Sequence, residues 1–269
     1  MKESNAYILG TDTEELHRLG LQHQVWSSEA QKAWKDAGLT AGQTILDLGC
    51  GPGFCTRELA YIAGKKGKVI GIDLSENYIH FLQSIVDTHD LKVEAIAVNF
   101  NDMVLEDNSI DAMYCRWAMA WVPNPAEVIA KVYKALKPGG RMIFHEYYDW
   151  STHQTQPQMP YLSQAIAACL KSFKEQAGDI DIGRNLPEIL SKQGMRISRT
   201  RPMAKLARPG ELEWQWPRSF YEIYFFKLIE MGLITEELRV LAMKDLEELE
   251  HTPGASLCCP LLIEVIAEK

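Results

Sequence analysis

The sequence predicts an α/β protein in which a mostly parallel sheet carries helices on both faces. Two observations lead to this expectation. Short, nearly all-apolar segments alternate with helix-like segments between residues 41 and 150, a pattern typical of parallel strands joined by crossover helices. The alternation then ends at a polar, proline-containing segment, STHQTQPQMP, so helical insertions are expected to follow the sheet.

The first expected element is a helical lid segment, residues 1–40, in which one or two helices begin near Asp12 or Thr13. Either side chain can cap the first free backbone N–H groups of a helix. Residues 41–150 are expected to form the core of the fold in this succession: strand TILDLG, helix 54–63, strand KVIGID, helix 75–88, strand VEAIAV, strand SIDAMYC, helix 125–136, turn KPGG and strand RMIFHEY.

Two insertions are expected after the core. Residues 151–180 contain a helix-like run, and residues 181–210 return to the core with a helix and the strand ISRTRPMAKLA. Residues 211–252 form an aromatic cap insertion with an amphipathic helix, and residues 253–269 supply the last strand, LLIEVIAEK. Most aromatic side chains of the cap are expected in its own core, with one or two facing a ligand; a dimer face is the alternative. They are Trp214, Trp216, Phe220, Tyr221, Tyr224 and Phe225.

Composition narrows the class of partner. The chain has 269 residues, 46% of them hydrophobic, and a formal net charge of −8. Lys and Arg are not gathered into a basic stretch, which disfavours a nucleic-acid partner. The sequence has neither the ~20 apolar residues of a membrane span nor an apolar secretion signal at its start, so we expect a cytoplasmic protein. Six cysteines without C-x-x-C spacing favour buried thiols over disulfides or a metal site.

The stretch ILDLGCGPGF predicts a binding site. Ligands of parallel α/β sheets bind at the carboxyl ends of the strands, often at the turn after the first strand. Here Gly49, Gly51 and Gly53 follow Asp47 in G-x-G-x-G spacing. A dinucleotide turn has G-x-G-x-x-G spacing, and a carboxylate before the turn suits a cationic ligand better than a phosphate. Pro52 also removes one backbone donor. A nicotinamide-dependent oxidoreductase is therefore only a rival interpretation.

Three segments together resemble the class I S-adenosylmethionine-dependent methyltransferases: ILDLGCGPGFCTRELA, GKVIGIDLSENYI and DNSIDAMYCRWAMAWVPNPAEVIAKVYKALKPGGRMIFHE. The resemblance covers about residues 40–148. It implies a Rossmann-like, seven-stranded sheet whose last strand runs antiparallel, with S-adenosyl-L-methionine as the cofactor.

The resemblance also implies roles for residues of the glycine turn and the second strand. It places the methionine part of the cofactor over Asp47, Gly49 and Gly51, with a backbone carbonyl near Gly49 accepting from its ammonium group. Asp73 is expected to accept hydrogen bonds from both ribose hydroxyls, and Leu74 to pack against the adenine. The alternative for Asp73 is a helix cap, and for the glycines a tight turn alone.

At the third strand the sequence departs from the family. The aspartate that commonly accepts a hydrogen bond from the adenine amino group is replaced by Asn99, which is followed by Phe100. The Asn99 amide oxygen can still accept, and the backbone N–H of Phe100 can still donate to the ring, so we expect weaker or differently tuned binding. Asn99 is equally compatible with a simple turn.

Further candidates follow the fourth and fifth strands. By resemblance, the backbone at Arg116 and Trp117 lines the methionine moiety. The Trp117 ring could face the sulfonium through a cation–π contact, with core packing as an equal alternative. His145 is a candidate general base for O-methyl transfer, although strand alternation leaves only one of His145 and Glu146 facing any one side.

The lid segment offers Tyr7 and Gln24, because leading segments of related enzymes often reach the carboxyl end of the cofactor. Ordinary helix packing is the alternative for both. The sequence thus predicts a methyltransferase acting on oxygen, nitrogen or carbon of a small organic acceptor, with a quinone-precursor C-methyltransferase as the second choice. A cofactor-binding regulator or partner subunit without methyl transfer is the alternative from another class. A homodimer is left open.

Overall fold

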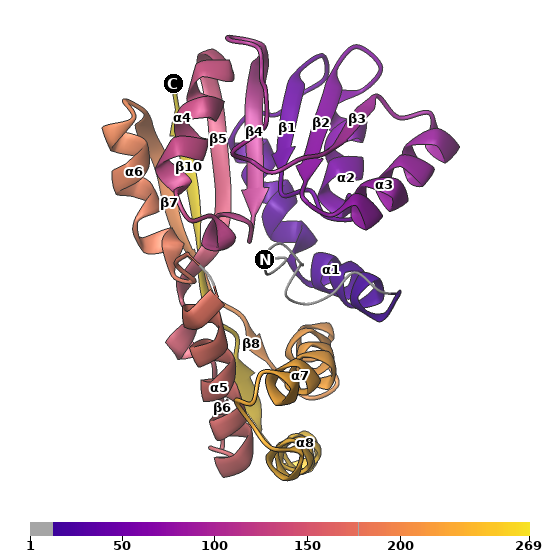
Figure 1. The fold of residues 1–269 in the computed structure, drawn as a ribbon, viewed down its shortest axis with the longest axis vertical. Coiled ribbons are helices and arrows are strands. Elements are labelled where there is room, and N and C mark those ends of the chain that lie inside the picture. The colour runs from indigo at the N-terminus through magenta and orange to yellow at the C-terminus, as the bar shows by residue number, and fades with distance from the viewer. Residues whose placement is uncertain (1–12, 177) are drawn as a thin grey trace, which may run out of the picture.

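The computed structural model describes residues 13–176 and 178–269. Its main sheet has seven strands in the order β3-β2-β1-β4-β5-β10-β7 (Figure 1). Neighbouring strands from β3 to β5 pair in parallel, whereas β10 runs antiparallel to both β5 and β7. The α/β expectation and the antiparallel last strand are confirmed. The strands are β1 (Thr44–Leu48), β2 (Lys68–Asp73), β3 (Val93–Ala97), β4 (Ile110–Arg116), β5 (Leu136–Asp149), β7 (Arg196–Met203) and β10 (Leu261–Glu268).

Helices cover both faces of this sheet because successive strand side chains point to opposite sides. Ile45, Tyr114 and Ile143 pack with residues of α1 and α2 in one buried cluster. Leu46 and Phe144, one position further along their strands, join α4 and α6 in another. The helices are α1 (Thr13–Asp36), α2 (Phe54–Ala63), α3 (Glu76–His89), α4 (Pro125–Ala135) and α6 (Leu186–Lys192).

A second layer, which we call the cap, lies beyond the carboxyl ends of the parallel strands (Figure 1). Its small sheet, in the order β6-β9-β8, was not expected from the sequence. The cap comprises β6 (Gln154–Gln156), α5 (Pro160–Gln176), β8 (Leu206–Ala207), α7 (Leu212–Glu230), α8 (Glu236–His251) and β9 (Ser256–Cys258). Short 3-10 helices η1 (Met119–Trp121), η2 (Trp150–Thr152) and η3 (Ile182–Arg184) complete the described elements.

Two expected boundaries were wrong. The single strand expected over ISRTRPMAKLA is divided into β7 in the main sheet and β8 in the cap. The turn expected at KPGG belongs to β5, because Leu136 already pairs with Ile110 and the backbone of Gly139 and Gly140 exchanges hydrogen bonds with Lys269.

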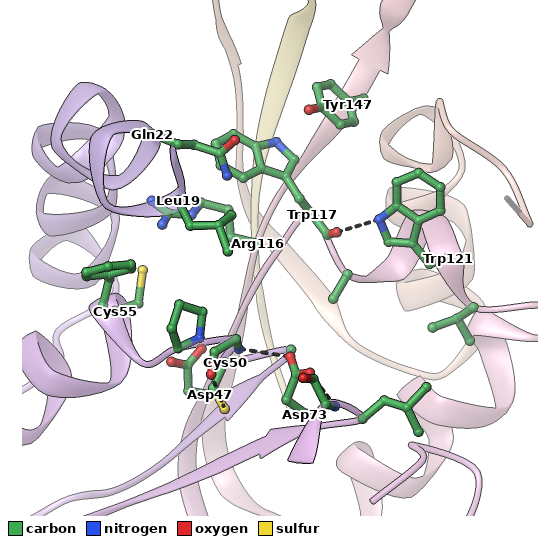
Figure 2. A pocket seen from close by; sticks show the side chains of 18 of the residues that line it. Leu19, Gln22, Asp47, Cys50, Cys55, Asp73, Arg116, Trp117, Trp121 and Tyr147 are labelled. Carbon is green, nitrogen blue, oxygen red and sulfur yellow. Dashed lines mark hydrogen bonds between the residues drawn. The ribbon is translucent and has the colours of Figure 1, made fainter. Parts of the chain in front are cut away.

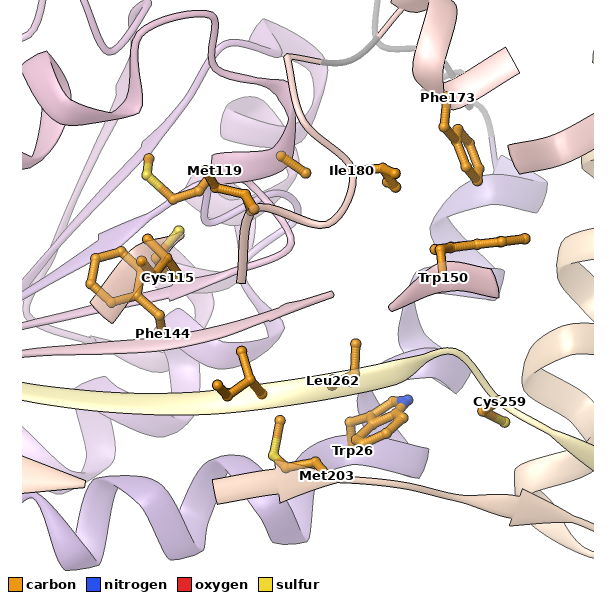
Figure 3. Close-up of a cluster of buried hydrophobic side chains, with 14 of the residues drawn as sticks. Trp26, Cys115, Met119, Phe144, Trp150, Phe173, Ile180, Met203, Cys259 and Leu262 are labelled. Atoms are coloured by element: carbon orange, nitrogen blue, oxygen red, sulfur yellow. The ribbon is translucent and has the colours of Figure 1, made fainter. Parts of the chain in front are cut away.

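The hydrophobic core is continuous from the sheet into the cap. One buried cluster contains Phe144 of the sheet, Met119 of η1, Trp150 of η2 and Phe173 of α5 in the cap (Figure 3). Leu262 of β10 lies between these two groups. The cap is therefore packed onto the sheet as part of the same core, which gives the space between them fixed walls. Within the part of the chain that the structure describes, no helix is both long and apolar enough to span a membrane.

Candidate functional site

A cavity of about 1260 Å3 lies at the carboxyl ends of β1, β2 and β4, beneath the cap. Pockets for one small molecule typically measure ~300–1000 Å3, so this cavity has room for two. Its polar end follows the sheet strands, and Figure 2 shows Asp47 and Asp73 there, opposite Trp117 and Tyr147. The aromatic end is lined by Trp121, Tyr147, Trp150, His153, Phe173, Trp216 and Phe220.

The glycine turn between β1 and α2 requires glycine for different reasons at successive positions. Gly49, Gly51 and Gly53 have φ of 78°, 53° and 85°, in the left-handed region that disfavours other residues. A Cβ at Gly49 would lie 2.3 Å from the Ala118 Cβ, and one at Gly53 would lie 2.3 Å from a Leu82 methyl group. A Cβ at Gly51 would meet nothing within 4 Å. Gly51 therefore leaves open space where it lines the cavity.

Asp47 lies at the base of the cavity, almost fully buried at the end of β1. The Thr56 hydroxyl of α2 donates a hydrogen bond of 2.6 Å to its carboxylate. Burial raises the pKa of Asp47 to about 6, against the opposing effect of Thr56. Near neutral pH the group is mainly a carboxylate that a cation would stabilise further.

Asp73 organises the space next to the glycine turn. Its two carboxylate oxygens accept backbone hydrogen bonds from Gly51 N (2.8 Å) and Ser75 N (2.9 Å). Burial raises its pKa, although these hydrogen bonds oppose the rise. Each oxygen retains a further lone pair for a ligand hydroxyl. Leu74 beside it lines the cavity with 44% of its surface exposed, which leaves an apolar surface available to a flat ring.

Asn99 and Phe100 line the same end of the cavity. The Asn99 amide oxygen accepts a hydrogen bond of 2.9 Å from Asn101 N, so the residue forms the turn that was the alternative interpretation. Its amide nitrogen makes no hydrogen bond to a described residue in this arrangement. Asn99 can thus serve the turn and still present a donor to the cavity.

Arg116 ends β4 and brings a cation to the polar end. Its Nη2 donates to His23 Nδ1 at 3.2 Å, and His23 in turn donates to Glu58 at 2.9 Å. The Arg116 Nη1 is buried and has no hydrogen-bond partner among the described residues. A buried donor without a partner costs free energy, which an anionic ligand group in this lining would recover.

Trp117 separates the two ends of the cavity. It has φ 56°, which is rare for a bulky residue. Its ring stacks between Tyr147 and Trp216, with ring centroids 6.0 Å and 5.7 Å away. The backbone is held on both sides: Trp117 N donates to the His145 carbonyl, and its carbonyl accepts from Trp121 Nε1 at 3.0 Å. The ring is thereby part of the cavity wall and of the aromatic packing together.

The family comparison decides the class of this site. A family described as a methyltransferase domain matches residues 39–198, more than half of the chain. The chain belongs to this methyltransferase family. It is an S-adenosylmethionine-dependent methyltransferase, as the sequence predicts, and the nicotinamide-dependent alternative is set aside.

Relatives of the methyltransferase act on different molecules, according to their names. It is 29% identical over 189 residues to a demethylmenaquinone methyltransferase of Lactococcus lactis, covering 64% of this chain and 72% of that protein. It is 33% identical over 139 residues to phosphoethanolamine N-methyltransferase 2 of Caenorhabditis elegans, covering 51% of this chain and 31% of that protein. The [4+2]-cyclase SpnF shares the fold alone, with a TM-score of 0.58, 16% identity, and coverage of 91% and 81%.

S-adenosylmethionine fits the polar end of the methyltransferase cavity. The open space at Gly51, the exposed face of Leu74 and the unpartnered Nη1 of Arg116 are three features that a ligand would complete. The carboxylates of Asp47 and Asp73 suit the ammonium group and the ribose hydroxyls, respectively.

Helix α1 of the lid segment lines the cavity with residues other than those expected from the sequence. Gln24 is exposed and does not line the cavity, and Tyr7 lies outside the described residues. Gln22 lines the cavity instead, and its amide oxygen accepts from Arg18 (2.9 Å) and from Trp216 Nε1 of α7 (2.8 Å). The residue two positions earlier faces inward because a helix turns by about 100° per residue.

The structure does not bring His145 to the cavity. The alternation of β5 points it toward the α1 face, where it is buried with Tyr114 and Glu264. Burial lowers the pKa of His145, although Glu264 opposes this shift. Burial alone would raise the pKa of Glu264, but hydrogen bonds from His145 and Arg201 bring it down to about 2. His145 is therefore a neutral donor to this carboxylate, and the expected role as a base is not supported.

Glu146, the neighbour of His145, points to the opposite side of β5 and holds the loop that lines the cavity after Trp117. Its Oε1 accepts from Ala118 N (3.0 Å) and Met119 N (2.9 Å), which fixes the loop after Trp117. Its Oε2 is buried without a hydrogen-bond partner among the described residues. Burial raises its pKa to about 8, against the effect of the two backbone donors, so Glu146 is a neutral acid near pH 7. An acidic residue in an apolar strand was the available sequence signal.

Proposed function

We propose that the methyltransferase transfers the methyl group to a small organic acceptor held at the aromatic end of the cavity. The observation that carries this proposal is the size and continuity of the cavity: one space of about 1260 Å3 joins the polar end to the aromatic end. Two molecules bound in one continuous cavity can hold their reacting atoms at contact distance, which is the largest part of what such a transfer needs from a protein.

The residues of the polar end have distinct roles in this proposal. Asp47 takes the ammonium of the methionine moiety, and Arg116 Nη1 takes its carboxylate. Asp73 binds the ribose, Leu74 packs against the adenine, and the turn at Asn99 presents its amide to the adenine edge. Bound S-adenosylmethionine supplies a methyl group on a sulfonium, whose positive charge is stabilised by the face of an aromatic ring such as Trp117.

The alternative is a cofactor-binding regulator or partner subunit that does not transfer the methyl group. Asn99 in place of the family's usual aspartate, and the position of His145 away from the cavity, give this alternative its support. The acceptor atom, a homodimer and a cytoplasmic location remain predictions from the sequence.

Calorimetry followed by a turnover assay tests the proposal. We expect S-adenosylmethionine to bind, and methyl-labelled S-adenosylmethionine to label at least one member of a panel of phenols, quinols and amines. Binding without labelling of any acceptor, in the panel or in a small-molecule extract, would favour the regulator. Absence of binding heat and of any thermal shift would contradict both.

A further inference from the structure

In the part of the chain that the structure describes, no unpaired charged side chain lines the aromatic end of the cavity. The charged residues that line the whole cavity are Arg18, Asp47, Asp73, Glu76 and Arg116. The last four belong to the polar end, on β1, β2, α3 and β4. Arg18 approaches from α1, but both Glu15 oxygens accept from its guanidinium, at 2.6 Å and 2.7 Å. This bidentate pair is buried, and Arg18 also donates to Gln22.

His153, the imidazole at the aromatic end, is uncharged as well. His153 donates from Nδ1 to the Cys258 carbonyl at 2.9 Å and accepts at Nε2 from the Tyr221 hydroxyl at 2.6 Å. Burial lowers the pKa of His153 to about 4, so the imidazole is uncharged at neutral pH. Both ring nitrogens are occupied, and His153 presents mainly its ring to the cavity.

The rings at this end are arranged for stacking. Phe173 and Phe220 each stack one face on Tyr224, with ring centroids 5.2 Å and 4.9 Å away. Trp121 and Trp150 meet Phe173 edge-on at 5.6 Å and 5.2 Å. Pairs of this kind favour offset-stacked or edge-to-face geometry, and a planar ring that lies against the cavity side of these rings can continue both patterns.

From these observations we infer that the acceptor is an uncharged molecule with a planar aromatic ring, bound among Trp121, Trp150, Phe173 and Phe220; this inference rests on the proposed function. A phosphate would lose its hydration here without a counter-charge, which is strongly unfavourable. An aliphatic ammonium could use ring faces, but no carboxylate of the described lining lies at this end to complete its site.

The transfer to such an acceptor balances without a further reagent. A lone pair of a ring hydroxyl, or the π electrons of a ring carbon, forms the new bond to the methyl carbon. The C–S bond breaks with its electron pair remaining on sulfur, which becomes a neutral thioether. The proton lost by the acceptor passes to water, because His153 Nε2 already accepts from Tyr221.

Binding probes of three kinds test the inference with the full chain. In the presence of saturating S-adenosylhomocysteine, calorimetry compares 1-naphthol and a hydroquinone with phosphoethanolamine and with sarcosine. We expect the two uncharged aromatic probes to bind and the other two to bind at least ~10-fold more weakly. Preferential binding of the phosphate or of the amine would overturn the inference and leave the proposed function standing. Failure of every aromatic probe to bind would also overturn it.

A matched pair of variants on α7 tests the location. Phe220 lines the cavity, whereas Phe226 on the same helix is 49% exposed and is not part of the lining. Loss of one aromatic pair lowers affinity by roughly 2- to 10-fold, so Phe220→Leu should weaken the aromatic probe by that factor with the S-adenosylmethionine affinity unchanged. Phe226→Leu should change neither. Equal effects of the two substitutions would refute this site for the aromatic ring.

Failure of the proposed function itself has a different signature. In that case S-adenosylmethionine and S-adenosylhomocysteine give no heat with the unmodified protein, whatever the aromatic probes do.

Discussion

The two ends of the cavity are specified by different kinds of information. The polar end is made by backbone turns directly after β1, β2, β3 and β4, so its side chains lie within a few residues of a strand. The aromatic end is made by side chains from η1, from β5 and the residues that follow it, and from α5 and α7. These elements span about a hundred residues of the sequence (Figure 1). Trp117 belongs to both ends. The comparison teaches that the polar end follows from local sequence, whereas the aromatic end follows from how the insertions pack.

The largest expected effect concerns the polar end. Asp73→Ala removes the acceptor of Gly51 N and Ser75 N together with the proposed ribose ligand. Hydrogen bonds to charged groups contribute about 1.5–3 kcal/mol each, so S-adenosylmethionine affinity should fall by roughly 100-fold in calorimetry. Asp87→Ala, an exposed change on α3, is the control. Unchanged affinity of the Asp73 variant would remove this residue from the site.

Two glycines of the turn should separate stability from binding. Gly49→Ala places a methyl group 2.3 Å from the Ala118 Cβ at φ 78°, and we expect a loss of about 2–4 kcal/mol in the free energy of unfolding. Gly51→Ala meets no atom within 4 Å, so it should cost only about 1–2 kcal/mol for its φ while weakening cofactor binding. Urea denaturation and calorimetry measure the two quantities. Equal stabilities would show that the contact with Ala118 relaxes freely.

Glu146, which holds the loop after Trp117, should make the stability of the protein depend on pH. Its pKa is raised to about 8, above the ~4.3 of an exposed glutamate. The folded protein therefore binds more protons than the unfolded chain between these values, and the stability contributed by the neutral acid is lost as pH rises through this window. Glu146→Gln keeps the neutral shape. Its stability advantage over the parent protein should grow by about 1–3 kcal/mol between pH 6.5 and pH 8.5.

Denaturation of both proteins at several pH values measures this difference. Glu248→Gln, an exposed change on α8, is the matched control and should show no such trend. A stability difference that stays constant with pH would mean that Glu146 is already ionised in the folded protein.

The smallest effect is expected at His145, which lies outside the cavity. A general base typically contributes about 100-fold or more to a rate. His145→Gln should instead leave turnover, measured per folded protein, within about 2-fold of the parent value, because the residue serves Tyr114 and Glu264. A loss near the size of a general-base effect would return His145 to the mechanism.

The sheet and most of the polar end could be predicted because short, continuous stretches of sequence determine both. Alternating apolar strands fixed the order of elements, and Asp47, Gly49, Gly51 and Asp73 line the cavity as expected. The glycines act through backbone conformation, which depends on few neighbours. The antiparallel direction of the last strand was predicted from the resemblance to methyltransferases, because the spacing of apolar residues does not indicate strand direction.

Other features could not be predicted because they depend on orientation between elements. Helical spacing does not say whether Gln22 or Gln24 faces inward until α1 is placed against α7. Strand alternation allowed either His145 or Glu146 to face a given side. The small sheet of the cap joins segments about 50 or more residues apart. Its strands are too short to show an alternating pattern in the sequence. Trp216 and Phe220 match the expectation that one or two cap aromatics face the cavity.

The continuous core has a consequence for exchanging acceptor preferences between relatives. Phe173 of the cap and Trp150 of η2 belong to the same buried cluster as Met119 of η1 and Phe144 of β5. If the cap alone were transplanted onto the sheet of a relative, its apolar side chains would lose the sheet residues against which they pack. A chimaera of two relatives should therefore have its junctions in surface loops. It should take the residues of η1 and β5 that contact the cap from the same parent as the cap.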